Sequence, residues 1–246
     1  MLTYLINFIL NILLIDTSEK RAEYGYSEKG KIIFRKTLKE LMSADEVIFS
    51  LKSDFINRKI KFKTLDYIGL SNGPGSFTGM RIGSAIAKGI CFSTKCELIE
   101  LNSLDITANK IKNKGYYTVL IDSNMRTGEL YCADYHINTV KNNSGKNSRA
   151  TVRISDYYII TKDELRKSLS DGQTDKNYLT NDEINLPELC NYTNLSYTDN
   201  IESMLDLTES EIKERKFSKT KSGYKSSEPY YMKDISLFKT TIKDKN

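Results

Sequence analysis

A glycine-rich segment, residues 71–90, constrains the fold of this chain more than any other feature. It follows an apolar run, residues 65–70, that is typical of a buried strand, and it leads into a stretch with helical periodicity. Between them stand three glycines and one proline: Gly73, Pro74, Gly75 and Gly79. Glycine permits backbone angles that are closed to other residues, and proline fixes φ. The sequence therefore predicts a strand–loop–helix unit whose loop holds one shape.

This loop lacks the patterns of the familiar phosphate-binding and nucleophile loops. A Walker A motif needs Gly-Lys-Ser/Thr at the helix start, where this chain has Gly-Met-Arg at 79–81. The dinucleotide pattern G-x-G-x-x-G has Thr78 in place of its last glycine, and the elbow G-x-S-x-G fails because Gly75 directly precedes Ser76. Anion binding at the helix N-terminus stays open as an alternative. We favour a structural loop that sets the helix position, made of Gly73, Pro74, Gly75, Ser76, Thr78 and Arg81.

The helix expected over residues 79–91 is apolar nearly all round. At about 100° per residue, its isoleucines and its small residues form two neighbouring stripes: Ile82, Ile86 and Ile90, and Gly79, Gly83 and Ala87. A helix of this kind is covered on more than one side. We expect the isoleucines to cover the sheet. The small residues would then admit a second helix, either from this chain or from another subunit.

Residues 73–83, with the sequence GPGSFTGMRIG, resemble the signature of the TsaB (YeaZ) family, bacterial proteins that assist threonylcarbamoyladenosine formation on tRNA. The family hallmark reads close to GPGSFTGLRIG, so that Met80 is the only departure. Other segments resemble the family in the expected order: residues 12–18, 87–89, 100–104, 121–131 and 228–233. The resemblance covers residues 10–135 and is thin from there to 227.

The order of the expected elements is typical of an actin-like, ribonuclease-H-like α/β domain. Strands are expected at residues 12–15, 21–26, 31–36, 65–70 and 97–101, and helices after the capping residue Ser43, at 79–91 and from Ser103 to 113. We expect this domain, a mixed sheet flanked by helices, over residues 11–113, after an N-terminal extension at 1–10. A smaller, degenerate second α/β lobe with polar loops is expected over 114–246. Its predicted features are strands at 117–122, 129–137 and 157–160, a polar loop at 138–150, and helices after Thr161 and at 201–213.

The resemblance implies a non-catalytic subunit. TsaB proteins bind their paralogue TsaD, which holds the metal and transfers the threonylcarbamoyl group, and the ATPase TsaE joins them. The helices that begin near Ser43 and Gly79 are implied to pack against the partner. The predicted interface consists of Val47, Leu51, Gly79, Met80, Gly83, Ser84 and Ala87. A Gly83→Arg change is then expected to abolish association and leave the monomer folded. Pairing of two copies is an alternative when TsaD is absent, and tRNA is expected to be an indirect partner.

Composition favours the absence of catalytic residues, metal and cofactor on this chain. It has one histidine, His136, and four cysteines without a C-x-x-C pair, which leaves too few ligands at usable spacing for zinc. Isolated cysteines suit a reducing cytoplasm, where we expect the protein to lie. A Ser–His–Asp triad would need His136, which falls in a strand-like run. A peptidase is therefore disfavoured.

An actin-like small-molecule kinase or ATPase is the main alternative. Such folds bind nucleotide with an Asp-x-Gly turn after the first strand, but this chain has Asp-Thr-Ser-Glu at 16–19, and Glu19 would repel a phosphate. The net charge of +5 is a mild excess, and the basic segment 213–225 is either a phosphate contact or a solvated loop. The apolar stretch 4–15 is shorter than the about 20 residues that a membrane span takes, so no membrane association is expected.

Overall fold

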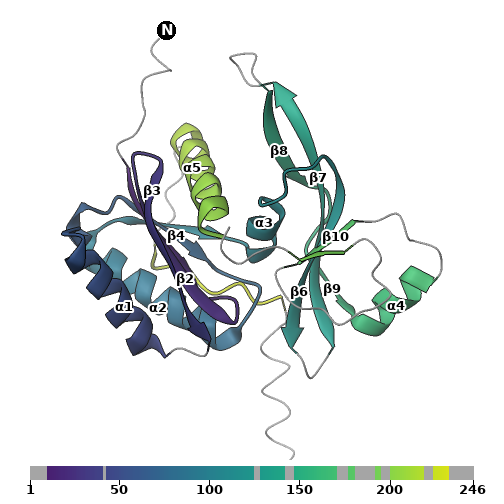
Figure 1. The fold of residues 1–246 in the computed structure, drawn as a ribbon, viewed down its shortest axis with the longest axis horizontal. Helices are drawn as coiled ribbons and strands as arrows, with labels where there is room; N and C mark the ends of the chain where they lie inside the picture. Colours follow the sequence, from purple (N-terminus) through teal and green to yellow (C-terminus); the bar gives the residue numbers. More distant parts are fainter. Residues whose placement is uncertain are drawn as a thin grey trace, which may run out of the picture.

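The computed structural model describes residues 10–40, 43–124, 128–141, 147–170, 177–180, 192–194, 200–218 and 224–232. The strands form two sheets that lie in separate lobes, with a short helix, α3 (Ser103–Ala108), between them (Figure 1). The predicted extension at residues 1–10 falls outside the described residues except for Leu10, which packs against the core on one face of the first sheet, and part of the basic segment 213–225 also falls outside them.

The first sheet has five strands in the order β3-β2-β1-β4-β5. Their bounds are Asn11–Asp16 (β1), Arg21–Glu28 (β2), Lys31–Glu40 (β3), Tyr67–Ser71 (β4) and Glu97–Leu101 (β5). Strands β1, β2 and β3 pair antiparallel, whereas β4 lies parallel to β1 and to β5. This is the mixed sheet that the order of elements predicts.

Helices cover both faces of this sheet. Alternation along β1 sends Leu13 and Ile15 into a core with α1 (Ala44–Asn57) and α2 (Phe77–Thr94). Ile12 and Leu14 point to the opposite core, which α3 and α5 (Asn200–Ser218) close. The predicted capping box at the start of α1 is confirmed, since Ser43 and Glu46 each accept a hydrogen bond from the other's backbone. A single 3-10 turn, η1 (Phe62–Thr64), precedes β4.

The second sheet has the order β11-β10-β6-β7-β8, with β9 paired to β7. Its strands are Gly115–Asn124 (β6), Glu129–Lys141 (β7), Asn147–Arg153 (β8), Tyr158–Thr161 (β9), Asn177–Thr180 (β10) and Tyr192–Asn194 (β11). Helix α4 (Lys162–Ser170) packs on one face, and α3 packs on the other through Leu104 and Ala108. Because α3 contributes to the cores of both lobes, it joins them.

Two predicted segments in the second half differ from the structure. The polar segment 138–150 is not only a loop: β7 runs to Lys141 and pairs with β8, so that Val140 faces Ser148. Backbone pairing forms this hairpin without the apolar alternation that sequence reading relies on. Helix α5 lies in the range assigned to the second lobe, yet it packs on the first sheet. Gly25 and Gly69 allow its close approach, because a Cβ there would overlap Ile201 and Thr208.

The predicted ends of two helices also change. Helix α2 begins at Phe77, with Ser76 as its N-cap, and runs to Thr94, where Lys95 adopts a φ of 68° and ends it. Helix α3 is capped by Asn102 and not by Ser103, and it ends at Ala108. A longer α2 adds a further turn to the side of the sheet that α1 shares.

Candidate functional site

The glycine-rich loop packs tightly on the end of β1. The backbone N–H of Ser76 donates to the Ser18 carbonyl at 2.6 Å, and a Cβ on Gly75 would overlap that same carbonyl group. Gly73 has a φ of 101°, which favours glycine. The side-chain oxygen of Ser76 accepts from the Gly79 N–H at 3.2 Å and caps α2. These contacts agree with a loop that sets the position of the helix.

The remaining loop residues lie at the start of α2. Pro74 is buried and Thr78 is exposed. The Arg81 guanidinium lies 3.9 Å from the centre of the Phe77 ring, and its Nε donates to the Tyr231 hydroxyl at 3.3 Å. The closing segment of the described chain thus packs over the entrance to the helix.

The carboxyl edge of the first sheet is filled by its own side chains. Ser18, Ser71 and Ser103 follow or end β1, β4 and β5, and their hydroxyl oxygens lie 2.9 to 3.1 Å from one another. Ser18 also donates to Asp16 at 2.7 Å, and Asn200 of α5 donates to the other carboxylate oxygen of Asp16 at 3.0 Å. All five residues are buried. Ligands of α/β proteins usually bind at this edge, but here a closed hydrogen-bond cluster occupies it.

A buried acid lies directly opposite Asp16 across the β1–β2 pair. Glu23 is 3% exposed, and its Oε1 accepts from the Thr37 hydroxyl at 3.3 Å. Burial, and then the negative charge of Asp16, raise the pKa of Glu23 from 4.5 to about 8, against the opposing effects of Lys110, Thr37 and Arg35. Glu23 therefore stays protonated in the folded chain at neutral pH.

This raised pKa predicts a pH-dependent stability. Between pH 4.5 and about 8 the folded chain keeps a proton on Glu23 that the unfolded chain has lost, so the free energy of unfolding is expected to fall as pH rises. The loss is roughly 1.4 kcal/mol for each unit of the shift. Glu23→Gln is expected to flatten this slope. Urea unfolding of both proteins from about pH 5 to about pH 9 measures it, and parallel curves for the two would contradict the assignment to Glu23.

The residues predicted to contact a partner are covered by the chain itself. Five of them are at most 4% exposed: Val47, Leu51, Met80, Ser84 and Ala87. A Cβ on Gly83 would overlap the Thr17 hydroxyl and reach 3.2 Å from Leu70, and one on Gly79 would overlap the Thr17 carbonyl. The small residues admit the chain's own sheet and not a second subunit. The structure thus places these seven residues on the inner side of α1 and α2, and the use of these two helices as an interface stays a prediction.

The outer side of the same two helices carries apolar side chains in solvent. On α1, Ile48 is 46% exposed, Phe49 76% and Ile56 63%, and on α2, Phe92 is 64% exposed. Ala85 and Gly89 lie on the same exposed side of α2, and a Cβ on Gly89 would meet nothing within 4 Å. Helices α1 and α2 run side by side in Figure 1. We call this set, Ile48, Phe49, Ile56, Ala85, Gly89 and Phe92, the α1–α2 outer surface.

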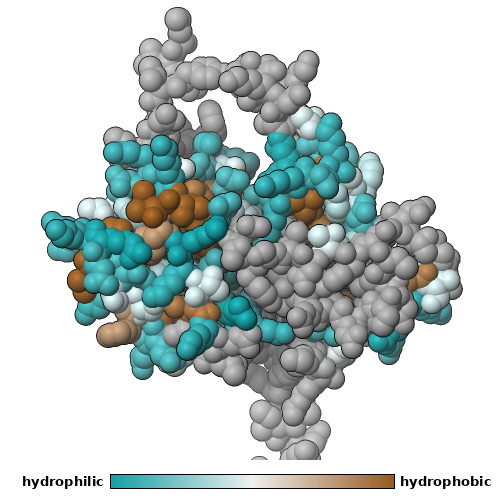
Figure 2. Space-filling view, viewed as in Figure 1, coloured by the Kyte–Doolittle hydropathy of each residue, from teal (hydrophilic) through white to brown (hydrophobic). Residues whose placement is uncertain are grey.

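Large apolar residues in solvent are the signal that sequence reading missed. Ile48 and Ile56 fit the apolar spacing of the first helix, and nothing in the sequence pattern marks Phe49 or Phe92 as exposed. Figure 2 shows hydrophobic surface, in brown, in separate areas among hydrophilic residues on the lobe that holds α1 and α2, and the largest area lies above these two helices in this view. Exposed apolar patches mark interaction sites in soluble proteins.

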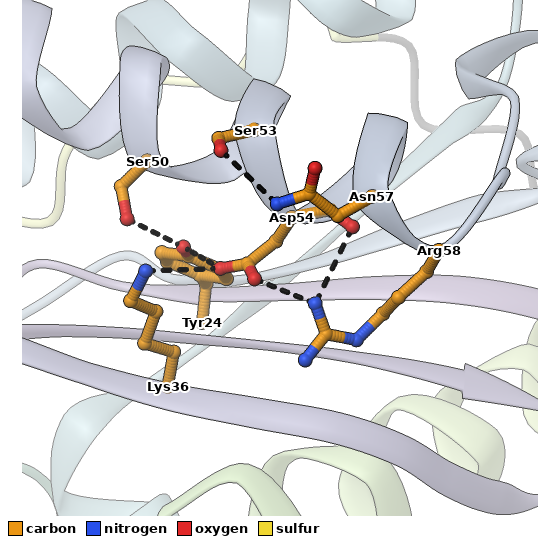
Figure 3. Close-up of polar contacts among 7 residues, drawn as sticks. All are labelled: Tyr24, Lys36, Ser50, Ser53, Asp54, Asn57 and Arg58. Atoms are coloured by element: carbon orange, nitrogen blue, oxygen red, sulfur yellow. Dashed lines mark hydrogen bonds and ion pairs between the residues drawn. The ribbon is translucent and has the colours of Figure 1, made fainter.

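A charged cluster fixes the orientation of α1 and hence its outer side (Figure 3). The Asp54 carboxylate accepts from the Tyr24 hydroxyl at 2.6 Å, from Lys36 at 3.2 Å and from Arg58 at 2.6 Å. Burial opposes ionisation of Asp54, but these hydrogen bonds from Tyr24, Lys36 and Arg58 hold its pKa below the usual range. Because Tyr24 and Lys36 belong to β2 and β3, the cluster ties α1 to the sheet.

Candidate metal and triad residues stay apart in the described part of the chain. No three His, Cys, Asp or Glu side chains there are placed to hold a metal ion. His136 lies on β7 with its ring stacked on Tyr116, the ring centres being 4.4 Å apart. Among the same residues, none of the helices has both the length and the apolar character that crossing a membrane requires.

Comparisons with known proteins place these features in a family. The family model described as "TsaD: tRNA N6-adenosine threonylcarbamoyltransferase" matches residues 45–207. A protein of Buchnera aphidicola subsp. Schizaphis graminum named "tRNA threonylcarbamoyladenosine biosynthesis protein TsaB" is 31% identical over 148 residues, 58% of this chain and 69% of that protein. The Escherichia coli K12 protein of the same name is 26% identical over 127 residues, which span 51% of this chain and about half, 55%, of its own length.

Two solved structures share the fold. A Pseudomonas aeruginosa protein described as having similarity to peptidase YEAZ has a TM-score of 0.65 at 15% identity, and "YeaZ from Pseudomonas aeruginosa" has 0.63 at 13% identity. Each comparison covers 91% of this chain and 100% of the solved one. This likeness confirms the predicted actin-like α/β fold.

Proposed function

Because this chain belongs to the TsaB (YeaZ) family, within the wider group that the TsaD family model describes, we propose that it acts in threonylcarbamoyladenosine biosynthesis on tRNA. The relatives that carry this name support the proposal, as does a matched fold over nearly the whole chain. The general function that we propose is thus a role in tRNA modification.

The finer proposal is that the chain is a non-catalytic subunit that binds a TsaD-type paralogue through the α1–α2 outer surface. One observation carries it: Phe49 and Phe92 are 76% and 64% exposed on adjacent helices that the Asp54 cluster and the sheet hold in place. Aromatic residues are enriched at protein–protein interfaces, and burying them on association is favourable. A Cβ on Gly89 would meet nothing within 4 Å, so the exposed side of α2 has room there for a side chain of the partner.

The filled carboxyl edge of the first sheet supports a subunit without its own reaction centre. An actin-like kinase or ATPase would need room there for a nucleotide, but the serine cluster and Asn200 occupy that edge in a buried network. A TsaE-type ATPase is proposed as a third component, and tRNA as an indirect partner. A second copy of this chain would use the same α1–α2 outer surface when the paralogue is absent.

The test is association with the TsaD-type protein of the same organism, with and without ATP and the TsaE-type ATPase. We expect the two chains to co-purify as a stable pair without ATP. We further expect that neither chain alone modifies tRNA, and that the mixture with the ATPase does so. Two results would contradict the proposal: modification by this chain alone, or two folded proteins that elute separately at every concentration.

A further inference from the structure

Two cysteines lie next to each other at the end of α2. Cys91 is in the last turn of the helix, and Cys96 directly precedes β5. Their Sγ atoms are 3.5 Å apart, and both thiols are free. Cys91 is fully buried, whereas Cys96 retains 6% exposure.

The backbone between them turns back on itself. Lys95 has a φ of 68°, and its N–H donates to the Cys91 carbonyl at 2.8 Å. This left-handed residue ends the helix and brings positions 91 and 96 together, as in other helix C-caps. A disulfide has an S–S length of about 2.05 Å, so the two sulfur atoms need to approach by only about 1.5 Å.

We propose that Cys91 and Cys96 form a reversible intramolecular disulfide, which makes this turn a redox modification site. The inference is independent of the proposed function, because it depends only on the two sulfur atoms and the turn that holds them. The turn also carries Phe92, so the disulfide would fix the position of one residue of the α1–α2 outer surface.

The two thiols suit different steps of the exchange. The contact between the two thiols lowers the pKa of Cys96 and raises that of Cys91. Cys96 also retains 6% exposure whereas Cys91 is fully buried, so Cys96 is the attacking thiolate. Cys96 Sγ attacks one sulfur of a small disulfide such as oxidised glutathione, and a glutathione thiolate leaves and takes up a proton. Cys91 then loses its proton, and its sulfur attacks Cys96 Sγ and displaces the second glutathione. Two protein thiols and one glutathione disulfide thus give one protein disulfide and two glutathione thiols.

Cys132 offers a matched control. It is buried on β7 in the second sheet, where burial and the charge of Asp134 raise its pKa, and its Sγ lies 3.5 Å from the Leu130 carbonyl. Low thiolate content makes it a poor nucleophile. It is therefore expected to stay reduced under conditions that oxidise the pair.

The experiment uses the full chain with Cys190, which lies outside the described residues, changed to alanine in every variant. The protein is equilibrated with glutathione mixtures of increasing oxidised fraction, and free thiols and intact mass are measured after acid quenching. We expect the count of free thiols to fall from three to one, with a mass loss of two hydrogen atoms and no bound glutathione. Cys132→Ala is expected to keep the mass loss. Cys91→Ala is expected to hold one glutathione on Cys96 instead.

Circular dichroism melting of the reduced proteins establishes that each variant is folded, and a serine at the same position replaces any alanine variant that is not. The proposal is overturned if three thiols persist at every ratio in the folded parent. It is also overturned if Cys91→Ala shows the same loss of two hydrogen atoms. Neither result bears on association with a TsaD-type protein, so this inference and the proposed function fail separately.

Discussion

Replacing Gly89 by arginine is expected to abolish association with the TsaD-type partner and to leave the chain folded. A Cβ at this exposed position would meet nothing within 4 Å, so the arginine is expected to extend into solvent in the free protein. In the complex it would place an unpaired charge against the partner on the exposed side of α2 that carries Phe92, and a buried unpaired charge costs about 3–5 kcal/mol. The affinity is therefore expected to fall by more than about 100-fold, as measured by titration calorimetry and co-purification.

Two controls make this result specific. Gly89→Ala adds only a methyl group in open space and is expected to bind the partner. Ser170→Arg adds the same charge at the exposed end of α4, far along the chain, and is expected to bind as the parent does. If Gly89→Arg is folded and still co-purifies at the parent's level, the α1–α2 outer surface is not the interface.

Alanine at two glycines of α2 is expected to change stability in opposite directions. Gly83→Ala would push a methyl group against the Thr17 hydroxyl, which donates to the Gly79 carbonyl at 2.7 Å, and against Leu70. Overpacking of this kind costs about 1–3 kcal/mol of unfolding free energy. Gly89→Ala gains helix propensity without a clash, worth up to about 1 kcal/mol. Urea unfolding of the two variants and the parent measures the difference.

The same geometry corrects the expectation for Gly83→Arg. A guanidinium cannot be placed between α2 and β4 without displacing Thr17 or Leu70, so this variant is expected to unfold the first lobe and not simply to block association. For the two alanine variants, equal free energies of unfolding of Gly83→Ala and Gly89→Ala would contradict the close packing of α2 against Thr17 and Leu70.

Local signals predicted the elements of the first lobe well. The Ser43–Glu46 capping box marks the start of α1, and the glycine-rich loop marks the junction of β4 and α2. Such signals act over a few residues and leave a direct trace in sequence. The ends were less certain, because the N-cap Ser76 and the left-handed Lys95 lie just outside the periodic stretch.

The facing of α2 could not be predicted from periodicity. The isoleucine stripe and the glycine stripe are neighbours on the helix, and a period of 3.6 residues states which residues share a side but not what covers it. The close approach to Thr17 decides the matter, and Thr17 is 62 residues away from Gly79 along the chain. The candidate interface differs from the predicted one for the same reason. In sequence, Phe49 and Phe92 resemble core residues, and only the structure shows that the sheet packs on the opposite side of their helices.

Contacts over long sequence separations explain the remaining differences. Asn200 reaches Asp16 across 184 residues, and no local pattern links them. The β7–β8 hairpin is polar on much of its length, so its backbone pairing left no alternation to detect. The position of α5 on the first sheet depends on Gly25 and Gly69, which lack side chains that would overlap the helix. This role is visible only when β2 and β4 are placed in the assembled sheet.

The return of α5 to the first sheet sets the order in which the chain matures during synthesis. When residues 11–113 leave the ribosome, Ile12 and Leu14 on β1 still lack the part of their cover that α5 supplies, because Asn200–Ser218 has not yet been translated. Part of the apolar surface on this side of the sheet stays exposed to solvent while the second lobe is synthesised. A nascent chain of this kind is exposed to aggregation until its late helix arrives.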